Sequence, residues 1–225
     1  MSSDAPQVVI FGVGQVADVA RAYLEQAGHR VAAFTVDEGF GDGEAHAGLP
    51  VVPWSALEAT FPPASARLFC PISYRQVNAL RKAKYLEGRA RGYRFLSFVH
   101  ANCVNNAQSI GENCFILENN VLQPFTRIGD NVVLWSGNHI GHHSVIGDHS
   151  FLASHVVVSG GVTIGPRCFL GVNATVGDNL KLGEGVVVGA GALVLRDLPD
   201  ESVVGARASE ISSVPSSRLR GPVGR

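Results

Sequence analysis

Aliphatic side chains recur every six residues along the second half of the chain. Counting in sixes from Val104 to Val194, all sixteen positions carry Val, Ile or Leu, and the next residue is Gly nine times. Four residues after each aliphatic position the side chain is mostly small or Val, as a tight corner requires. A period of six fits neither a helix nor a simple hairpin meander, whereas a short strand plus a turn, repeated around a triangular prism, has this period.

Three hexads, or 18 residues, close one coil, so sixteen hexads predict just over five coils. Each aliphatic side chain then stacks on its counterpart one coil away, which builds an apolar interior from repeats that could bury nothing alone. The alternative is an ordinary parallel sheet with glycine-rich turns, but no helical crossover interrupts residues 98–196. We therefore predict a parallel β-helix over residues 98–211 and a flexible tail over 212–225.

The first half of the chain predicts a small α/β domain, residues 1–97. A β-branched and aromatic run ends at a glycine turn, a helical pattern follows, and Gly28 ends that helix. A capping box formed by Ser55 and Glu58 predicts a short helix. The other expected elements are strands at 8–11, 30–36, 51–54 and 68–70 and a helix at 74–89, and the first helix follows Gln15 with apolar positions from Val16 to Leu24.

The glycine turn and an acidic residue just over twenty positions later have the layout of a nucleotide-binding unit. Backbone N–H groups at such a turn bind phosphate, and the acid lies at the end of the second strand. Ala17 stands where a third glycine is expected, and the domain is too small for a full dinucleotide fold, so we expect a smaller ligand than NAD. A structural turn that binds nothing is the alternative. The candidate binding residues are Gly12, Val13, Gly14, Gln15 and Asp37.

Histidines are concentrated in one stretch of the repeat. The hexad frame points Ile140 and Ser144 inward, so the histidine pair between them faces out at a turn. Three histidines share one slot in consecutive hexads and therefore point to three different corners, so they cannot converge on one metal within a chain. We expect His149 to lie at the surface. The five histidines of this stretch are His139, His142, His143, His149 and His155.

An imidazole at the turn suits general-base catalysis, because it titrates near neutral pH and can remove a proton from an attacking amine or hydroxyl. Ser159-Gly160-Gly161 falls 18 residues after the histidine turn, so it lies one coil above it on the same edge. A glycine there leaves its backbone N–H open to a ligand, and Gly160 is our candidate for stabilising an oxyanion. Plain structural glycines are the alternative.

Composition narrows the class of protein. With 18 Lys+Arg against 19 Asp+Glu, the net charge of −1 gives no basic surface for nucleic acid. Four cysteines without CxxC spacing, a start without a signal-peptide pattern and the lack of any membrane-length apolar run predict a reduced, cytoplasmic protein away from the membrane. Outward-facing Leu117 and Trp135 would be exposed in a monomer, which favours self-association.

The hexads resemble the hexapeptide-repeat acyltransferases, and together with the small domain they resemble sugar acyltransferases of the NeuD, PglD and perosamine N-acetyltransferase type. The resemblance covers the chain to about Ile211. It implies an N-terminal Rossmann-like nucleotide-binding domain followed by a left-handed parallel β-helix. It also implies a homotrimer with active sites between neighbouring prisms and a nucleotide-linked sugar, rather than NAD, in the small domain, where Asp37 contacts the base.

The resemblance also assigns catalytic roles. His142 matches the general base, and the amide of Gly160 polarises the thioester carbonyl of acetyl-CoA. Val172, Gly189 and Ala190 match positions along the pantetheine channel. Gly141 stands where the family has an acid that orients the base, and the candidates for that task here are Asn138, His139 and His143.

From these features we predict an acetyl-CoA-dependent N-acetyltransferase that acts on the amino group of a nucleotide-linked amino sugar and uses no metal. An O-acetyltransferase of the sialic-acid type is the nearest alternative. A metal hydratase with a site shared between subunits, as in the γ-class carbonic anhydrases, and a non-catalytic nucleotide-binding scaffold are the alternatives from other classes.

Overall fold

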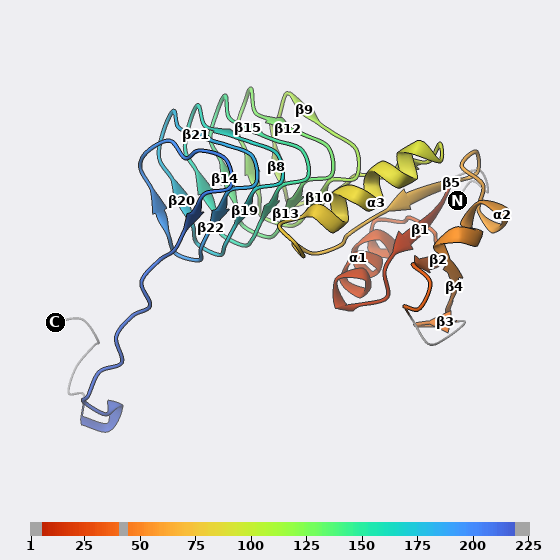
Figure 1. The fold of residues 1–225 in the computed structure, drawn as a ribbon, viewed down its shortest axis with the longest axis horizontal. Helices are drawn as coiled ribbons and strands as arrows, with labels where there is room; N and C mark the ends of the chain where they lie inside the picture. The colour runs from red at the N-terminus through yellow and green to blue at the C-terminus, as the bar shows by residue number, and fades with distance from the viewer. Residues whose placement is uncertain (1–5, 41–44, 219–225) are drawn as a thin grey trace.

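The computed structural model of the protein describes residues 6–40 and 45–218. It consists of an α/β domain followed by a parallel β-helix, and the chain then leaves the end of the prism (Figure 1). The first five residues, on which part of the localisation argument rests, and residues 219–225 of the predicted tail lie outside the described residues. Among the described residues, no helix is both long enough and apolar enough to cross a membrane.

The N-terminal sheet has the strand order β3-β4-β2-β1-β5-β6, and only the short pair β3 and β4 is antiparallel. Its strands are β1 (Gln7–Phe11), β2 (Val31–Val36), β3 (Ala45–His46), β4 (Leu49–Pro53), β5 (Ala66–Phe69) and β6 (Arg94–Phe95). Its helices are α1 (Gln15–Gln26), the 3-10 turn η1 (Trp54–Ala56), α2 (Leu57–Thr60) and α3 (Ala79–Ala90). Gly28 ends α1 with a φ of +84°, as its position in the sequence predicts.

The β-helix is a prism with three parallel sheets of two-residue strands. The seven-stranded sheet contains β7 (Phe98–Val99), β10 (Phe115–Ile116), β13 (Val133–Leu134), β16 (Phe151–Leu152), β19 (Phe169–Leu170), β22 (Val187–Val188) and β24 (Val203–Val204). The six-stranded sheet contains β8 (Val104–Asn105), β11 (Val121–Leu122), β14 (His139–Ile140), β17 (Val157–Val158), β20 (Thr175–Val176) and β23 (Leu193–Val194). The five-stranded sheet contains β9 (Ser109–Ile110), β12 (Arg127–Ile128), β15 (Val145–Ile146), β18 (Thr163–Ile164) and β21 (Lys181–Leu182).

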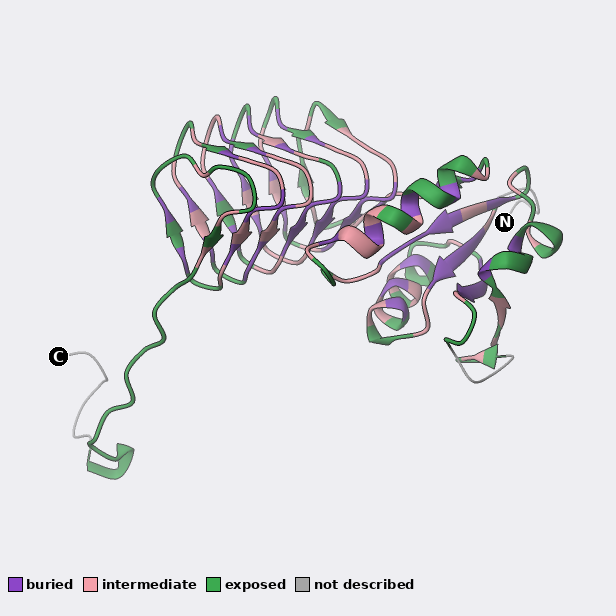
Figure 2. Cartoon of the chain, in the orientation of Figure 1, coloured by how far each residue is buried: buried purple, intermediate pink, exposed green. Residues whose placement is uncertain are grey.

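Pairing 18 residues apart stacks the aliphatic positions inside the prism. Ile116 pairs in register with Leu134, and Leu134 with Leu152, and all three side chains are buried (Figure 2). From Asn113 onward, each corner repeats a tight turn in which one residue has a positive φ. Asn131 and His149 occupy this place in successive coils, at φ of +57° and +63°. Asn tolerates this left-handed backbone better than most residues, whereas His carries a larger side chain there.

The first coil departs from the predicted frame. Val104 pairs with Val121, and Asn105 with Leu122, so this coil is one residue shorter than the central coils. The expectation that Val104 belongs to the interior column is therefore wrong, and its side chain is 54% exposed. The interior column is regular from Ile110, which pairs with Ile128, to Val194, which pairs with Val176. The last coil is also shorter, because Val187 pairs with Val203.

Two local expectations in the small domain are also wrong. The helix predicted over 74–89 begins only at Ala79, because Gln76, Val77 and Asn78 have left-handed backbone. No capping box forms at Ser55: α2 has no side-chain cap, and Glu58 instead accepts a hydrogen bond from Arg91 Nε at 2.6 Å.

The small domain covers the seven-stranded sheet. Phe115, Leu117 and Phe151 on the outer face of that sheet share one buried cluster with Ile10 and Leu24 of the small domain. Leu117 is 1% exposed, and Trp135 packs against the same cluster. The chain itself therefore covers these two side chains, and the prediction that a monomer would expose them is wrong.

Helix α3 attaches the small domain to the corner of the prism between the five- and seven-stranded sheets, which we call the α3 corner. Arg81 is fully buried there, and its guanidinium donates to the carbonyl oxygens of Asn131, His149 and Ser150. It also donates to the side-chain oxygens of Asn78, at 2.8 Å, and Asn131, at 3.3 Å. Neutral acceptors thus hold a buried charge, which makes this contact costly to break.

His149 lies in this buried network, and the expectation that it is at the surface is wrong. It is 7% exposed, and its Nδ1 is 2.9 Å from Nδ2 of Asn131. Because the ring nitrogen next to an amide N–H must act as acceptor, this contact requires a neutral imidazole. Burial, the main cause, lowers the pKa of His149 to about 4.

We predict that His149 makes the protein less stable in acid. The unfolded chain binds a proton at this residue below pH of about 6.5, whereas the folded chain binds it only near 4. Lowering the pH across that window should therefore remove up to about 3 kcal/mol of the free energy of unfolding. Denaturant titrations between pH 7 and 4 should show a shallower loss for His149→Asn, which suits the left-handed backbone. His155→Asn, at the exposed equivalent slot, should behave as the wild type; an equal change in both variants would contradict the prediction.

Candidate active site

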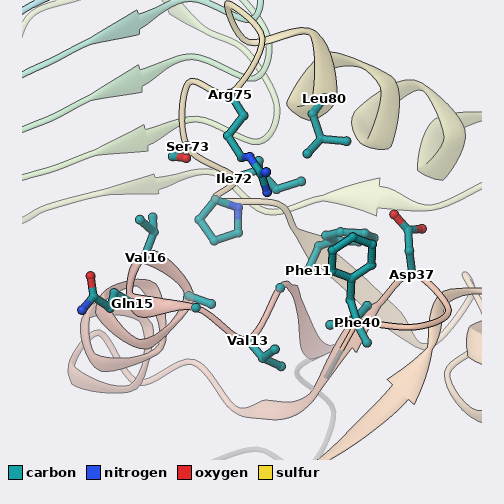
Figure 3. Close-up of a pocket in the computed structure, with 15 residues that line it drawn as sticks. Phe11, Val13, Gln15, Val16, Asp37, Phe40, Ile72, Ser73, Arg75 and Leu80 are labelled. Atoms are coloured by element: carbon teal, nitrogen blue, oxygen red, sulfur yellow. The ribbon is translucent and has the colours of Figure 1, made fainter. Parts of the chain in front are cut away.

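A cavity of about 540 Å³ opens in the small domain at the carboxyl ends of its strands (Figure 3). All five predicted nucleotide-binding residues line it: Gly12, Val13, Gly14, Gln15 and Asp37. The structure therefore brings these residues to one site, as the sequence predicts. Ligands bind in this place in open parallel α/β sheets.

The glycine turn lets the backbone reach the cavity. Gly12 has a φ of +106°, a conformation that disfavours other residues, and its N–H donates to the carbonyl of Thr35 at 2.8 Å. Helix α1 begins at Gln15, directly after Gly14, and no side chain caps this end. The first turn of α1 thus presents its backbone N–H groups and the positive end of the helix dipole to the cavity, which suits an anion.

Asp37 marks one end of the cavity. Lys84 Nζ donates to its Oδ1 at 2.7 Å, which fixes the carboxylate at the end of β2. Figure 3 shows Asp37 and Phe40 at one end of the cavity, with Gln15 and Ser73 at the other. A flat aromatic ring beside a fixed carboxylate suits a nucleobase, since the ring can stack and the carboxylate can accept hydrogen bonds.

Sequence reasoning missed the wall that follows β5. Ile72, Ser73 and Arg75 line the cavity, and Leu80 completes that wall from α3. The position of this segment carried the signal: it follows the third parallel strand, and its carboxyl end lies at the same edge of the sheet as the glycine turn. The prediction of a helix beginning at residue 74 obscured it.

The histidine pair lies at the corner between the six- and five-stranded sheets, which we call the His142 corner. His142 and His143 are exposed, and Ile140 and Ser144 on either side are buried, as the hexad frame predicts. The Nδ1 atoms of the two rings are 3.1 Å apart. His143 has a φ of +59°, and its ring packs on Phe125 with a centroid distance of 4.6 Å.

His143 is thus the neighbour that can orient His142. The other two candidates for that task are not in contact with it in the described structure. Asn138 is buried and bonds to Trp135 and Val156, and His139 lies on the outer face of β14. If His142 donates its Nδ1 proton to His143, its Nε2 is left as an acceptor, which is the form that a general base needs.

Gly160 lies directly against the imidazole of His142. A Cβ atom at this position would be 2.8 Å from Nε2 and 2.7 Å from Cε1 of that ring. The absence of a side chain at Gly160 therefore leaves the space that His142 occupies. The sequence placed the two residues on one edge but did not show this contact.

The amide of Gly160 is not open, contrary to our expectation. Its N–H donates to Oδ1 of Asp178, one coil above, at 3.0 Å. The same bond recurs between Asp130 and Asp148 and between Glu112 and Asp130, so it belongs to the coil-to-coil structure. Asp178 is exposed. A ligand carbonyl could take this N–H only by displacing the carboxylate of Asp178.

The predicted pantetheine-channel residues lie at a different corner from His142. Val172, Gly189 and Ala190 belong to the turns between the seven- and six-stranded sheets, which we call the Val172 corner. The small-domain cavity is also away from His142, because that domain covers the seven-stranded sheet, which is opposite the His142 corner. A single chain therefore does not bring together His142, the Val172 corner and the small-domain cavity. Among the described residues, no three His, Cys, Asp or Glu side chains are grouped closely enough to hold a metal ion.

Comparisons with known proteins identify the class. The model of the family described as bacterial transferase hexapeptide (six repeats) matches residues 109–142, 125–160 and 161–196. A histidine-to-asparagine variant of perosamine N-acetyltransferase from Caulobacter crescentus, solved with CoA and GDP-perosamine, is 30% identical. That match covers 89% of this chain and 93% of that chain, with a TM-score of 0.80.

Two other structures share the fold at lower identity. The acetyltransferase domain of PglB from Neisseria gonorrhoeae is 20% identical over 90% of this chain and 97% of its own, with a TM-score of 0.79. WeeI from Acinetobacter baumannii is 20% identical over 90% of this chain and 97% of its own, with a TM-score of 0.69. No curated protein sequence matches the chain.

The small α/β domain and the prism of hexads therefore define a hexapeptide-repeat transferase with a left-handed parallel β-helix. More closely, the chain belongs to the sugar acyltransferases of this type, the group that contains perosamine N-acetyltransferase. The resemblance seen in the sequence is confirmed.

We predict that Gly160→Ala displaces the imidazole of His142 and leaves the fold intact. The new Cβ would collide with that exposed ring, which can rotate away, so the free energy of unfolding should change by less than about 1 kcal/mol. A crystal structure and a melting curve of the variant test both parts. Gly177→Ala is the matched control, since its Cβ would be 3.3 Å from the flexible side chain of Leu195. An unmoved His142 ring in Gly160→Ala would contradict the prediction.

Proposed function

We propose that the protein transfers the acetyl group of acetyl-CoA to the amino group of a nucleotide-linked amino sugar. The observation that carries this proposal is the pairing of a glycine-turn cavity ending at Asp37 with an exposed histidine packed on Gly160. The perosamine N-acetyltransferase, 30% identical, was solved with CoA and GDP-perosamine, which supports both classes of ligand. We assign Gly12, Val13, Gly14, Gln15 and Asp37 to the nucleotide-linked sugar.

His142 acts as the general base in this proposal. Its Nε2 accepts a proton from the amine as the amine nitrogen bonds to the thioester carbon, and it returns that proton to the departing thiolate of CoA. His143 holds the ring through the contact between the Nδ1 atoms, at 3.1 Å, and so supplies the orientation that Gly141 cannot provide. An imidazole thus takes the role that an acid has in the family.

Gly160 stabilises the oxyanion that forms at the thioester carbonyl. Its N–H donates to Asp178 in the described structure, so acetyl-CoA must exchange one acceptor for another at this amide. An exposed carboxylate can turn back to solvent, which keeps the cost of the exchange small. One oxyanion donor of this kind contributes roughly 3–4 kcal/mol to the transition state.

The complete site requires more than one copy of the chain, and we propose a homotrimer. His142 and the Val172 corner lie on opposite edges of the six-stranded sheet. A ring in which the His142 corner of one copy meets the Val172 corner of the next closes around the axis that this sheet faces. The outer face of the sheet includes Val104, Val157 and Leu193, which are 54%, 38% and 59% exposed. These residues replace Leu117 and Trp135 as the apolar surface that favours association.

One experiment separates this proposal from its alternatives. The protein is incubated with acetyl-CoA and a set of UDP-, GDP- and dTDP-linked amino sugars, and the products are analysed by mass spectrometry. A mass gain on the amine supports the proposal, whereas acetylation of a hydroxyl on a free sugar indicates an O-acetyltransferase. Stabilisation by zinc instead of CoA in a thermal-shift assay would favour a hydratase, and nucleotide binding without turnover a scaffold. We propose a cytoplasmic location, where both substrates are available.

We predict that His142→Asn lowers kcat by roughly 10²–10⁴-fold, the usual share of acid–base catalysis. Binding of acetyl-CoA should not change, since Asn removes only the base. Steady-state kinetics and calorimetric titration with CoA measure the two effects. His143→Ala is the informative partner variant: a smaller loss in kcat fits a residue that orients the base. A full loss of kcat in His143→Ala with little loss in His142→Asn would reassign the general base to His143. Losses below about tenfold in both variants would refute general-base catalysis by either histidine.

We predict that Val157→Asp breaks the trimer, because it places a charge in the middle of the outer face of the six-stranded sheet, at an exposed apolar side chain. Sedimentation velocity should show the wild type as a trimer and this variant as a monomer. Thr163→Asp, at the equivalent outward position on the five-stranded sheet, should stay trimeric. A wild-type protein that is a stable monomer at working concentration would refute both the trimer and the shared site.

A further inference from the structure

The segment between β5 and α3 joins the small-domain cavity to the prism. Ile72, Ser73 and Arg75 face the cavity on one side of this segment. Tyr74 and Asn78 contact the prism on the other. The path of the chain here therefore ties one wall of the nucleotide cavity to the outer surface of the β-helix.

The backbone of this segment is strained. Gln76, Val77 and Asn78 have φ values of +53°, +48° and +63°, and none of them is glycine. A left-handed conformation is especially unfavourable for β-branched Val77, and such strain persists only where the surroundings fix the conformation. Strained backbone of this kind is concentrated at ligand sites, so the turn calls for a functional explanation.

Two contacts with the prism hold the strained turn. Asn78 Nδ2 donates to the carbonyl oxygens of Arg167 and Cys168, at 3.2 and 3.0 Å. The ring of Tyr74 packs on the rings of Phe169 and Phe151, with centroid distances of 4.5 and 5.2 Å. Arg75 lies between these two anchors in the sequence, so the prism fixes the position of its backbone.

Arg75 extends into the cavity that also receives the first turn of α1. Figure 3 shows its guanidinium next to Ile72, on the wall opposite Val13. The cavity thus has two positive features, one from helix α1 and one from this side chain. Arg75 lies between the Asp37 end, which suits a nucleobase, and the Gln15 end, where α1 begins and where the sugar would leave.

We propose that Arg75 binds the diphosphate of the nucleotide-linked sugar and that Tyr74, packed on the prism, positions Arg75 to do so. The inference rests on the proposed function, since it presumes a nucleotide in this cavity. A guanidinium can donate two parallel hydrogen bonds to phosphate oxygens, which gives orientation as well as affinity. Different elements then hold the nucleobase and the diphosphate. The prism sets the position of the segment that carries Arg75 and thus binds the diphosphate.

Isothermal titration calorimetry with GDP, UDP and dTDP and with the corresponding nucleosides tests the role of Arg75. We expect Arg75→Gln to weaken binding of the preferred diphosphate at least about tenfold while changing nucleoside binding less than about twofold. Arg75→Lys should lie between, because it keeps the charge and loses the fork. Asp37→Ala should weaken nucleoside and diphosphate alike. Arg94→Gln is the matched control, an exposed arginine of the same domain that does not line the cavity.

The positioning role of Tyr74 is tested by comparing a variant that removes the ring with one that keeps it. Tyr74→Ala should weaken the diphosphate several-fold and spare the nucleoside, and Tyr74→Phe should restore wild-type binding, because the observed contacts are made by the ring. A loss of nucleoside binding in Tyr74→Ala would show a general structural defect and overturn the positioning role.

The failures are distinguishable. If the wild type binds none of the three diphosphates, the nucleotide cavity itself is refuted, and with it the role of Arg75. If the wild type binds a diphosphate and Arg75→Gln binds it equally well, only the inference about Arg75 is overturned.

Discussion

The central coils of the prism close after 18 residues through parallel strand pairing, and this register decides which side chains meet. It places His142 against Gly160, because the two lie one coil apart on the same corner. It gives each of the three sheets one outward column, so each face has its own character. The small domain covers one face, and the exposed apolar residues lie on another. The place of a residue within its coil therefore decides which sheet or corner of the prism it belongs to, and so which contacts it can make.

The slot shared by His143, His149 and His155 shows how one backbone position serves different purposes. All three have left-handed φ near +60°, so the repeat treats them alike. His143 contacts the proposed base, His149 is buried under α3, and His155 is exposed at the Val172 corner. The side chain's neighbours, rather than the repeat, thus give each histidine its role. A small domain docked on one corner is enough to convert a surface residue into a buried one.

The sequence predicted what depends on periodicity and on local chemistry. The hexads predicted the parallel β-helix, and the glycine turn at Gly12 together with Asp37 predicted the position of the cavity. What it could not predict depends on contacts between distant segments. Burial of Leu117 and His149 requires the docked small domain, and the late start of α3 at Ala79 follows from contacts of Asn78 with the prism. The bond from Gly160 to Asp178 was within reach, since the two positions are 18 residues apart and the same bond recurs elsewhere.

The shortened first coil shows where the chain tolerates a change in length. One residue is missing between the first interior positions, and the 18-residue register then holds from Ile110 until the last coil, which is also shortened. This coil has a neighbouring coil on one side only. Its strands β7 and β8 are both shifted by one residue relative to the hexad frame, and the shift exposes Val104. The strands of a central coil pair with a coil on each side. The same deletion there would turn interior apolar side chains outward and mismatch them with both neighbouring coils. Insertions and deletions in relatives should therefore gather at the ends of the prism, and in its middle they should come as whole coils.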